Sequence, residues 1–231
     1  GFTIGTTDGG TNQNNNTFAS WNWKAGTAFT NDASSTSIGS IDSAGSVSTD
    51  AGFSIQTYSG NGSAGATVAH GLGVTPNVII IKNRGSNERG WVVYHDKSSA
   101  TPEDNFLLLN TTAAIADLNR MQDTAPTSTV FSLSDDTHVN NASDTYVAYC
   151  FAEKQGYSKF GSYTGNANAD GPFVYTGFKP AWFMIKRTDA VSDWFLWDNK
   201  RGPINEITAR IVPNENAAEG SASMDFVSNG I

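Results

Sequence analysis

The residues that could serve as acid–base catalysts are few in this sequence. It holds three histidines, His70, His95 and His138. A nucleophile–histidine–acid arrangement needs one of them as its base. The sequence is duplicated, as described below, and Asp198 occupies the position of His95 in the second copy. A working base would be kept in both copies, so we expect that the protein has no catalytic residues and is not an enzyme.

Carboxylates could form two other kinds of site. A glycosidase needs two of them facing each other across a cleft, but no acidic pair recurs between the two copies. Calcium is the stronger alternative, because "SDD" at 134–136 and "NANAD" at 166–170 gather oxygen ligands in loops. Neither follows the D-x-[DN]-x-[DN]-G spacing, and ordinary Asx-turns explain both more simply. We therefore expect no metal or other cofactor, with calcium as the alternative.

Aromatic side chains offer a binding chemistry instead. Trp91 and Tyr94 lie in "WVVY", and Trp194 and Trp197 lie in the matching "WFLW" of the second copy. The two rings of each strand point to opposite faces, so one of them faces away from the core if the strand belongs to an outer sheet. Such exposed rings can stack on the apolar faces of sugars. These four residues are our candidates for a carbohydrate site; the alternative is that they fill the core.

The composition is typical of an all-β protein. Of the 231 residues, 38% are hydrophobic and 11% aromatic, which is enough to build a core. Only 16% are charged, and Ser, Thr, Asn and Gly carry the polarity, as suits strands and tight turns. Together with closely spaced turns, this predicts tandem antiparallel β-sandwich modules of jelly-roll or lectin type.

The charge and the single cysteine limit the partners and the compartment. A net charge of −8 without clustered basic residues argues against nucleic acid as a partner. No apolar stretch reaches the roughly 20 residues that cross a bilayer, so we expect no membrane insertion. Cys150 has no second cysteine to pair with, which favours synthesis in a reducing cytoplasm. Its apolar, alternating context predicts a small buried side chain.

Two long stretches of the sequence repeat each other. "GFSIQTYSGNGSAG" from Gly52 is matched by "GYSKFGSYTGNANADG" from Gly156, and "HGLGVTPNVIIIKNR" is matched by "TGFKPAWFMIKRT". The alignment pairs Lys82 with Lys186 and Trp91 with Trp194. Within it, "VIIIK" and "WFMIK" are apolar on both faces, so both are predicted to be central strands. A match in which turns, strands and aromatics keep one order indicates a duplicated module.

A second match sets the predicted domain boundaries. "FSLSDDTHVNNASDTYVAYCFAE" from Phe131 resembles "FTIGTTDGGTNQNNNTFASWNWK" from Phe2, with Trp21 for Tyr149 and Trp23 for Phe151. Residues 1–25 are thus predicted to be closing strands of a preceding or complemented module. Residues 26–51 form a Ser/Thr/Gly-rich linker or an exposed hairpin. Residues 52–155 form a complete β-sandwich module, and residues 156–231 form a second module that is incomplete at its C-terminus.

The phrases quoted above, together with "FLLLNTTAA", "TAPTSTVFSL" and "MDFVSNGI", resemble a repeat module of bacteriophage tail-fibre-like and other virion structural proteins, as found in phages of marine bacteria and cyanobacteria. The resemblance implies a concanavalin-like β-sandwich on a phage appendage, with no catalytic residues. It also implies a protein made in the host cytoplasm and carried on the virion surface. Its partners would be copies of itself (a homo-oligomer such as a trimer), other virion proteins and host-surface carbohydrate.

Three functions follow from these expectations. The first is a virion structural protein that attaches to host-surface glycans, where many weak contacts add up across copies. The second is a purely architectural spacer or capsid-decoration module without a ligand. The third, which lacks a paired acidic cleft in the sequence, is a polysaccharide-degrading enzyme.

Overall fold

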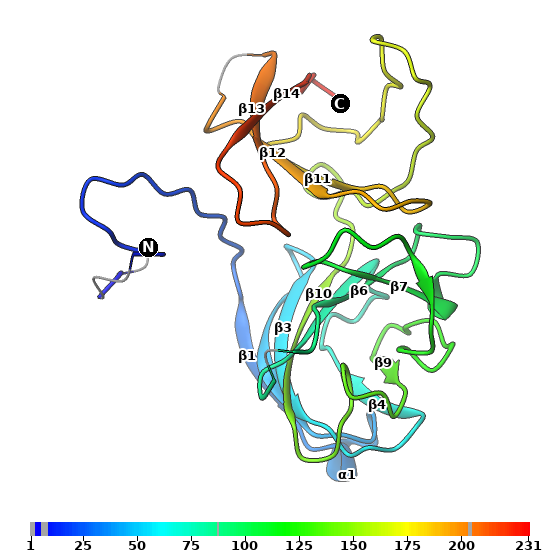
Figure 1. Cartoon of the computed structure of the whole chain (residues 1–231). Coiled ribbons are helices and arrows are strands. Elements are labelled where there is room, and N and C mark those ends of the chain that lie inside the picture. The colour runs from blue at the N-terminus through cyan, green and yellow to red at the C-terminus, as the bar shows by residue number, and fades with distance from the viewer. Residues whose placement is uncertain (1–2, 6–8, 87, 203–204) are drawn as a thin grey trace.

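The chain is built from two antiparallel sheets and a short two-stranded ribbon, as the computed structural model in Figure 1 shows. The structure describes residues 3–5, 9–86, 88–202 and 205–231. The large sheet has the strand order β1-β2-β3-β10-β5-β6-β7-β8. Its strands are β1 (Thr27–Asn31), β2 (Ser43–Ser48), β3 (Phe53–Ser59), β5 (Val78–Asn83), β6 (Val92–His95), β7 (Asn105–Leu108), β8 (Ala116–Asp117) and β10 (Thr145–Phe151).

The ribbon and the second sheet contain the remaining strands. The ribbon pairs β4 (Ala66–Ala69) with β9 (Val130–Leu133). The second sheet has the order β11-β12-β13-β14, with β11 (Trp182–Lys186), β12 (Trp194–Asp198), β13 (Ile207–Ile211) and β14 (Gly220–Met224). Two short helices complete the described elements, α1 (Ala33–Thr36) and a 3₁₀ turn (Pro102–Asp104).

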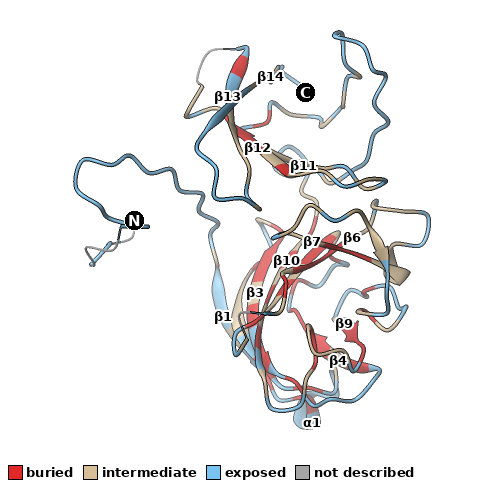
Figure 2. Cartoon of the chain, in the orientation of Figure 1, coloured by how far each residue is buried: buried red, intermediate tan, exposed pale blue. Residues whose placement is uncertain are grey.

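The main core lies between the large sheet and the ribbon. Ile79 and Ile81 of β5 pack there against Val68 of β4 and Phe131 of β9, all at most 1% exposed. Figure 2 shows buried segments in red along the strands of the large sheet and on β4 and β9. The predicted all-β antiparallel sandwich is therefore confirmed. Cys150 is also buried in this core, as its sequence context predicted.

Residues 26–51 contain a hairpin that widens the large sheet. Strand β1 pairs with β2, and β2 pairs with β3 along its full length. Between β1 and β2 the chain makes α1, which Asp32 caps by accepting hydrogen bonds from the backbone N–H groups of Ser34 and Ser35, both at 3.1 Å. The segment is thus held by strand pairing, and most of its Ser and Thr residues are exposed, while Ser43 and Ser48 are buried.

The second sheet repeats one half of the large sheet. Strands β11 to β14 correspond in order to β5, β6, β7 and β8. The strand registers also agree: Val78↔His95 matches Trp182↔Asp198, and Val93↔Leu107 matches Leu196↔Ile211. The duplication seen in the sequence is therefore also a duplication of strand pairing.

One side-chain hydrogen bond is repeated as well. The backbone N–H of Trp91 donates to Asn110 Oδ1, and that of Trp194 donates to Asn214 Oδ1, both at 2.8 Å. We expect Asn214→Ala to lower the free energy of unfolding by about 1–2 kcal/mol, because a partly buried donor loses its acceptor. Urea unfolding would measure the loss. Asn110→Ala should give a loss of similar size, and no change in either variant would contradict the structural role.

The second sheet lacks the other half of the sandwich. Strand β11 pairs only with β12 among the described strands, so the prediction that Trp182–Lys186 is a central strand is wrong. Residues 157–163, which match β3 in sequence, form no strand, and Tyr157 and Tyr163 are exposed. In the first copy β3 pairs with β10, and no strand of the described residues holds the position of β10 beside β11.

Residues 1–25 were predicted to form closing strands, and their described part forms none. Residues 1–2 and 6–8 lie outside the described residues. Figure 1 shows this segment leaving the large sheet ahead of β1. Its side chains Phe18, Trp21 and Trp23 are exposed. The ring of Trp23 nevertheless reaches the rings of Phe53, Phe151 and Trp182 at centroid distances of 6.4, 6.0 and 5.7 Å.

The second sheet packs on the outer face of the large sheet, meaning the face turned away from the main core. Val78, Val93 and Leu107 of the large sheet contact Trp194 and Met184 of the second sheet. The indole N–H of Trp194 also donates to the backbone carbonyl of Leu108 at 2.9 Å. The second sheet thus covers one part of the large sheet's outer face and leaves another part uncovered.

Candidate functional site

Three of the four predicted carbohydrate-binding residues are buried, which corrects that prediction. Tyr94 is 3% exposed in the main core, and Trp194, at 5%, lies between the two sheets. Trp197 is 3% exposed and donates its indole N–H to the carbonyl of Ala222 at 2.7 Å. Rings that are enclosed on both faces have no free surface for stacking on a sugar. These residues stabilise the fold and do not form a binding surface.

Trp91 is different, because it is half-buried at the uncovered part of the outer face. Its ring stacks with that of Tyr149, with the centroids 6.3 Å apart and the planes at 27°. The Asn110 hydrogen bond holds the backbone of Trp91 at the entrance to β6. Two aromatic rings from separate strands therefore form a partly exposed apolar platform.

Tyr149 was not among the residues predicted from the sequence, although strand alternation could have indicated it. In "TYVAYCF" of β10, Tyr146, Ala148 and Cys150 belong to the main core. Every second side chain points the opposite way, so Val147 and Tyr149 share the outer face. What the sequence alone did not show was which part of that face the second sheet leaves uncovered.

Several neighbours of the platform share its exposure. We call this surface the open face and define it by Ile55, Thr57, Lys82, Trp91, Val147 and Tyr149, all partly or fully exposed. They lie side by side because Val147 pairs with both Thr57 and Lys82, and Tyr149 pairs with Ile55. None of the six belongs to the cluster that joins the two sheets. The open face thus combines aromatic, aliphatic and polar side chains.

The open face continues into a shallow hollow of about 420 Å³ toward β1 and β2. Thr57 belongs to both, and the hollow is further lined by Thr30, Ala44, Arg84 and Thr145, among others. Hydroxyl groups and a guanidinium beside apolar rings are the combination with which proteins fix the orientation of polar ligands such as sugars. The carboxylates of Asp32 and Asp42 also line the hollow, and both accept hydrogen bonds from backbone N–H groups of α1. The arrangement therefore offers apolar, hydroxyl, cationic and acidic groups to a polar ligand.

Lys82 links the open face to the β5–β6 turn. Its Nζ donates to the backbone carbonyls of Ser86 at 2.9 Å and Arg89 at 2.6 Å. Partial burial lowers the pKa of this ammonium group. Since Trp91 follows this turn directly, Lys82 helps to fix the direction in which the chain enters β6.

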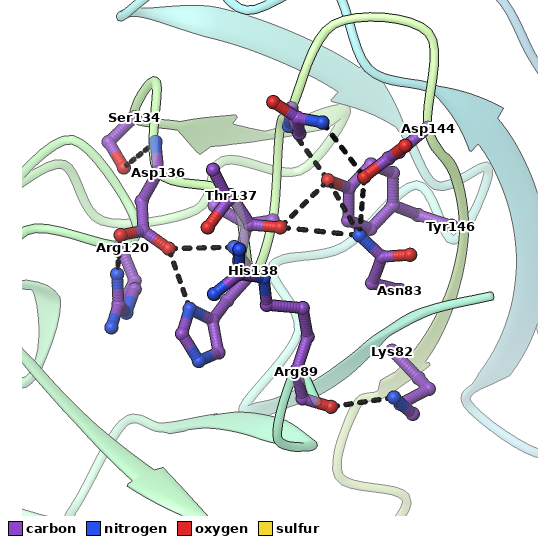
Figure 3. A network of polar contacts seen from close by, with 12 residues as sticks. Lys82, Asn83, Arg89, Arg120, Ser134, Asp136, Thr137, His138, Asp144 and Tyr146 are labelled. Carbon is purple, nitrogen blue, oxygen red and sulfur yellow. Dashed lines mark hydrogen bonds and ion pairs between the residues drawn. The ribbon is translucent and has the colours of Figure 1, made fainter. Parts of the chain in front are cut away.

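A polar network below the turn completes its support (Figure 3). Asn83 is 1% exposed and donates to Asp144 Oδ2 at 2.9 Å and to the hydroxyl of Tyr146 at 3.2 Å. Its Oδ1 accepts from the backbone N–H groups of Gly85 and Ser86 at 2.8 and 3.1 Å. Hydrogen bonds from Asn83 and Asn141 lower the pKa of the Asp144 carboxyl. The network rigidifies the loop that carries Trp91.

The same network contains a histidine beside a carboxylate, but not a catalytic triad. His138 Nδ1 lies 3.0 Å from Asp136 Oδ1, and Arg120 forms an ion pair with Asp136 Oδ2 (Figure 3). The hydroxyl of Ser134 accepts from the backbone N–H of Asp136 at 3.2 Å. This serine is therefore engaged with the backbone and is not aligned with the imidazole as a nucleophile would be.

Burial and nearby cations lower the pKa of His138 to about 4. Burial is the larger cause, and the charges of Arg120, Arg89 and Lys82 add to it. The imidazole is thus neutral at neutral pH and serves as a packed, hydrogen-bonded part of the loop.

This shift predicts a pH dependence of stability. A histidine whose pKa is lower in the folded state than its usual 6.5 stabilises the fold fully above that value. The contribution is lost as the pH falls from 6.5 toward 4, because the unfolded chain binds the proton more readily. We expect His138→Gln to reduce the stability lost between pH 7 and pH 4.5 by about 1–2 kcal/mol. Burial also lowers the pKa values of His70 and His95, so the variant should still lose some stability as the pH falls.

Urea unfolding at the two pH values would test this prediction. The change in the free energy of unfolding between the two pH values is compared for the variant and the unmodified chain. This comparison separates the titration of His138 from any pH-independent effect of the substitution. An unchanged pH dependence in His138→Gln would contradict it.

The two loops considered for calcium are Asx-turns. Asp136 Oδ1 accepts from the backbone N–H of His138 at 2.7 Å, and in the second loop Asn166 and Asn168 accept from the N–H groups two residues on, at 3.0 and 3.1 Å. Within the described ranges, no three His, Cys, Asp or Glu side chains come together as a metal site. Among the described helices, none has the length and apolar character to cross a bilayer.

Comparison with known proteins gives one match. No curated protein and no solved structure matches the sequence. Residues 1–231, which include both sheets and the open face, match a family described as "Domain of unknown function (DUF7483)". Because this match covers the whole chain, the protein belongs to the DUF7483 family.

Proposed function

We propose that this protein is a structural component of a bacteriophage virion, on a tail fibre or similar appendage, and that its open face binds host-surface carbohydrate. The observation that carries the binding proposal is the stacked, half-exposed pair of Trp91 and Tyr149 beside a hydroxyl-lined hollow. The sequence resemblance to virion repeat modules supports the wider role. Partners would be further copies of the chain and other virion proteins.

An architectural spacer is the second candidate. The burial of Tyr94, Trp194 and Trp197 favours it, since most of the large aromatic surface stabilises the fold. A spacer needs neither an exposed platform nor a polar hollow, and these two features favour attachment. Nothing in either role requires catalysis, so we expect no hydrolysis of the polysaccharide.

A carbohydrate array and whole host cells, both probed with the purified chain, would separate the two candidates. We expect saturable binding that weakens about tenfold or more in Trp91→Ala, the effect of removing a central contact residue. Tyr175→Ala is the matched control, because Tyr175 is 65% exposed and lies outside the open face. No binding to any carbohydrate or cell would contradict attachment and favour the spacer. Equal binding by both variants would place the site elsewhere.

A further inference from the structure

Strand β11 has an unusual environment for its sequence. Its residues "WFMIK" are almost all apolar, yet every one of them is only half-buried. The matching strand β5 has β10 on one side and β6 on the other, whereas β11 pairs only with β12 within the described residues. An apolar edge strand with free backbone groups is a template for adding another strand.

The chain contains a segment whose sequence fits that edge. Residues 17–23, "TFASWNW", match "TYVAYCF" of β10, the strand that pairs with β5. They form no strand here, and Phe18 and Trp21 are 51% and 36% exposed. The segment therefore has the pattern of a pairing strand without a pairing partner.

The expected register can be read from the first copy. There, Phe151 pairs with Val78 and Ala148 pairs with Ile81. The corresponding pairs in the second copy are Trp23 with Trp182 and Ser20 with Ile185. One of these contacts already exists, because the rings of Trp23 and Trp182 meet edge-to-face with centroids 5.7 Å apart.

A second observation marks the same edge as incomplete. The indole N–H of Trp182 is buried and has no hydrogen-bond partner in the described part of the structure. A buried donor without an acceptor costs free energy until an acceptor reaches it. The first residue of β11 thus carries an unsatisfied polar group beside Trp23.

We propose that residues 17–23 dock on the free edge of β11 in the same chain as an antiparallel strand, with Trp23 opposite Trp182. The ring contact between Trp23 and Trp182 already holds one end of the segment at this edge, so its local concentration there is high. Docking covers the apolar edge of β11 and adds to the second sheet the strand that corresponds to β10. The segment of a second copy would have to displace the Trp23 contact that is already made.

Register-specific crosslinking tests this proposal. Ser20→Cys with Ile185→Cys places two thiols at a pair without backbone hydrogen bonds, where antiparallel side chains lie closest. We expect a disulfide within one chain after mild oxidation. Ala19→Cys with Ile185→Cys is the control, because Ala19 faces the other side of the strand and should not crosslink. Cys150 is fully buried and does not compete.

Each other outcome overturns the proposal. A disulfide between two chains would identify a second copy as the occupant. Equal crosslinking of Ala19→Cys would show unspecific encounters, and no crosslink in either pair would show that the segment does not dock.

Hydrogen exchange provides a second measurement, because Ile185 packs in a cluster and its replacement can disturb folding. In the proposed register the amides of Ala19 and Trp21 face β11, so in the unmodified chain we expect them to exchange about tenfold or more slowly than those of an exposed peptide. Ala19→Pro removes one of these backbone donors and should abolish the protection. Exchange at exposed-peptide rates in the unmodified chain would overturn the proposal. Neither experiment involves carbohydrate, so its failure is distinct from a failure of the proposed function.

Discussion

Replacing Phe131 with alanine is expected to lower the free energy of unfolding by about 3–5 kcal/mol. Phe131 is 0% exposed at the centre of the main core, with its ring 6.2 Å from that of Tyr58. The substitution removes a buried ring and leaves a cavity between the ribbon and the large sheet. Since single domains are stable by about 5–15 kcal/mol, much of the native stability would be lost. Urea unfolding followed by circular dichroism would measure it.

Phe173→Ala is the matched control for this prediction. Phe173 is 58% exposed, so its loss should change the stability by no more than about 0.5 kcal/mol. Similar effects at the two positions would contradict the assignment of the main core.

The second large effect is expected at the junction of the two sheets. Trp194→Ala should destabilise the chain by about 3–5 kcal/mol, because Trp194 packs on Val93 and Leu107 and donates to the carbonyl of Leu108. The second sheet would lose its main anchor on the outer face. Thermal unfolding should then show a second, earlier transition for residues 156–231.

Trp91→Ala is the control here, since the repeat aligns Trp91 with Trp194 but the structure leaves Trp91 half-buried. We expect its stability to fall by about 1 kcal/mol or less. If the two alanine variants lost equal stability, the sheets would not pack as described.

Local patterns in the sequence were sufficient to predict the all-β fold class and the duplication of the module. Alternating apolar residues and turn-forming residues predicted antiparallel strands, and strand pairing in the two copies follows the same register. The buried position of Cys150 also followed from its apolar neighbours. These properties depend on a few adjacent residues, which the sequence displays directly.

Properties that depend on distant contacts were not predictable in this way. "VIIIK" and "WFMIK" have the same local character, yet β5 is central and β11 is an edge strand, because β10 pairs with β5 and no described strand takes that position beside β11. Trp91 and Trp194 occupy equivalent positions, and only the packing of one sheet on the other decides which is buried. Of the four predicted residues, only Trp91 lies on the open face, and its partner Tyr149 emerged from the arrangement of the strands.

The central claim is that the open face binds host-surface carbohydrate, and oxidative footprinting of the unmodified chain tests it most directly. In the presence of host-surface polysaccharide, we predict reduced oxidation of Trp91 and Tyr149 and unchanged oxidation of Tyr175. Protection elsewhere on the chain, or none at Trp91 and Tyr149 under conditions where the polysaccharide is bound, would contradict the claim.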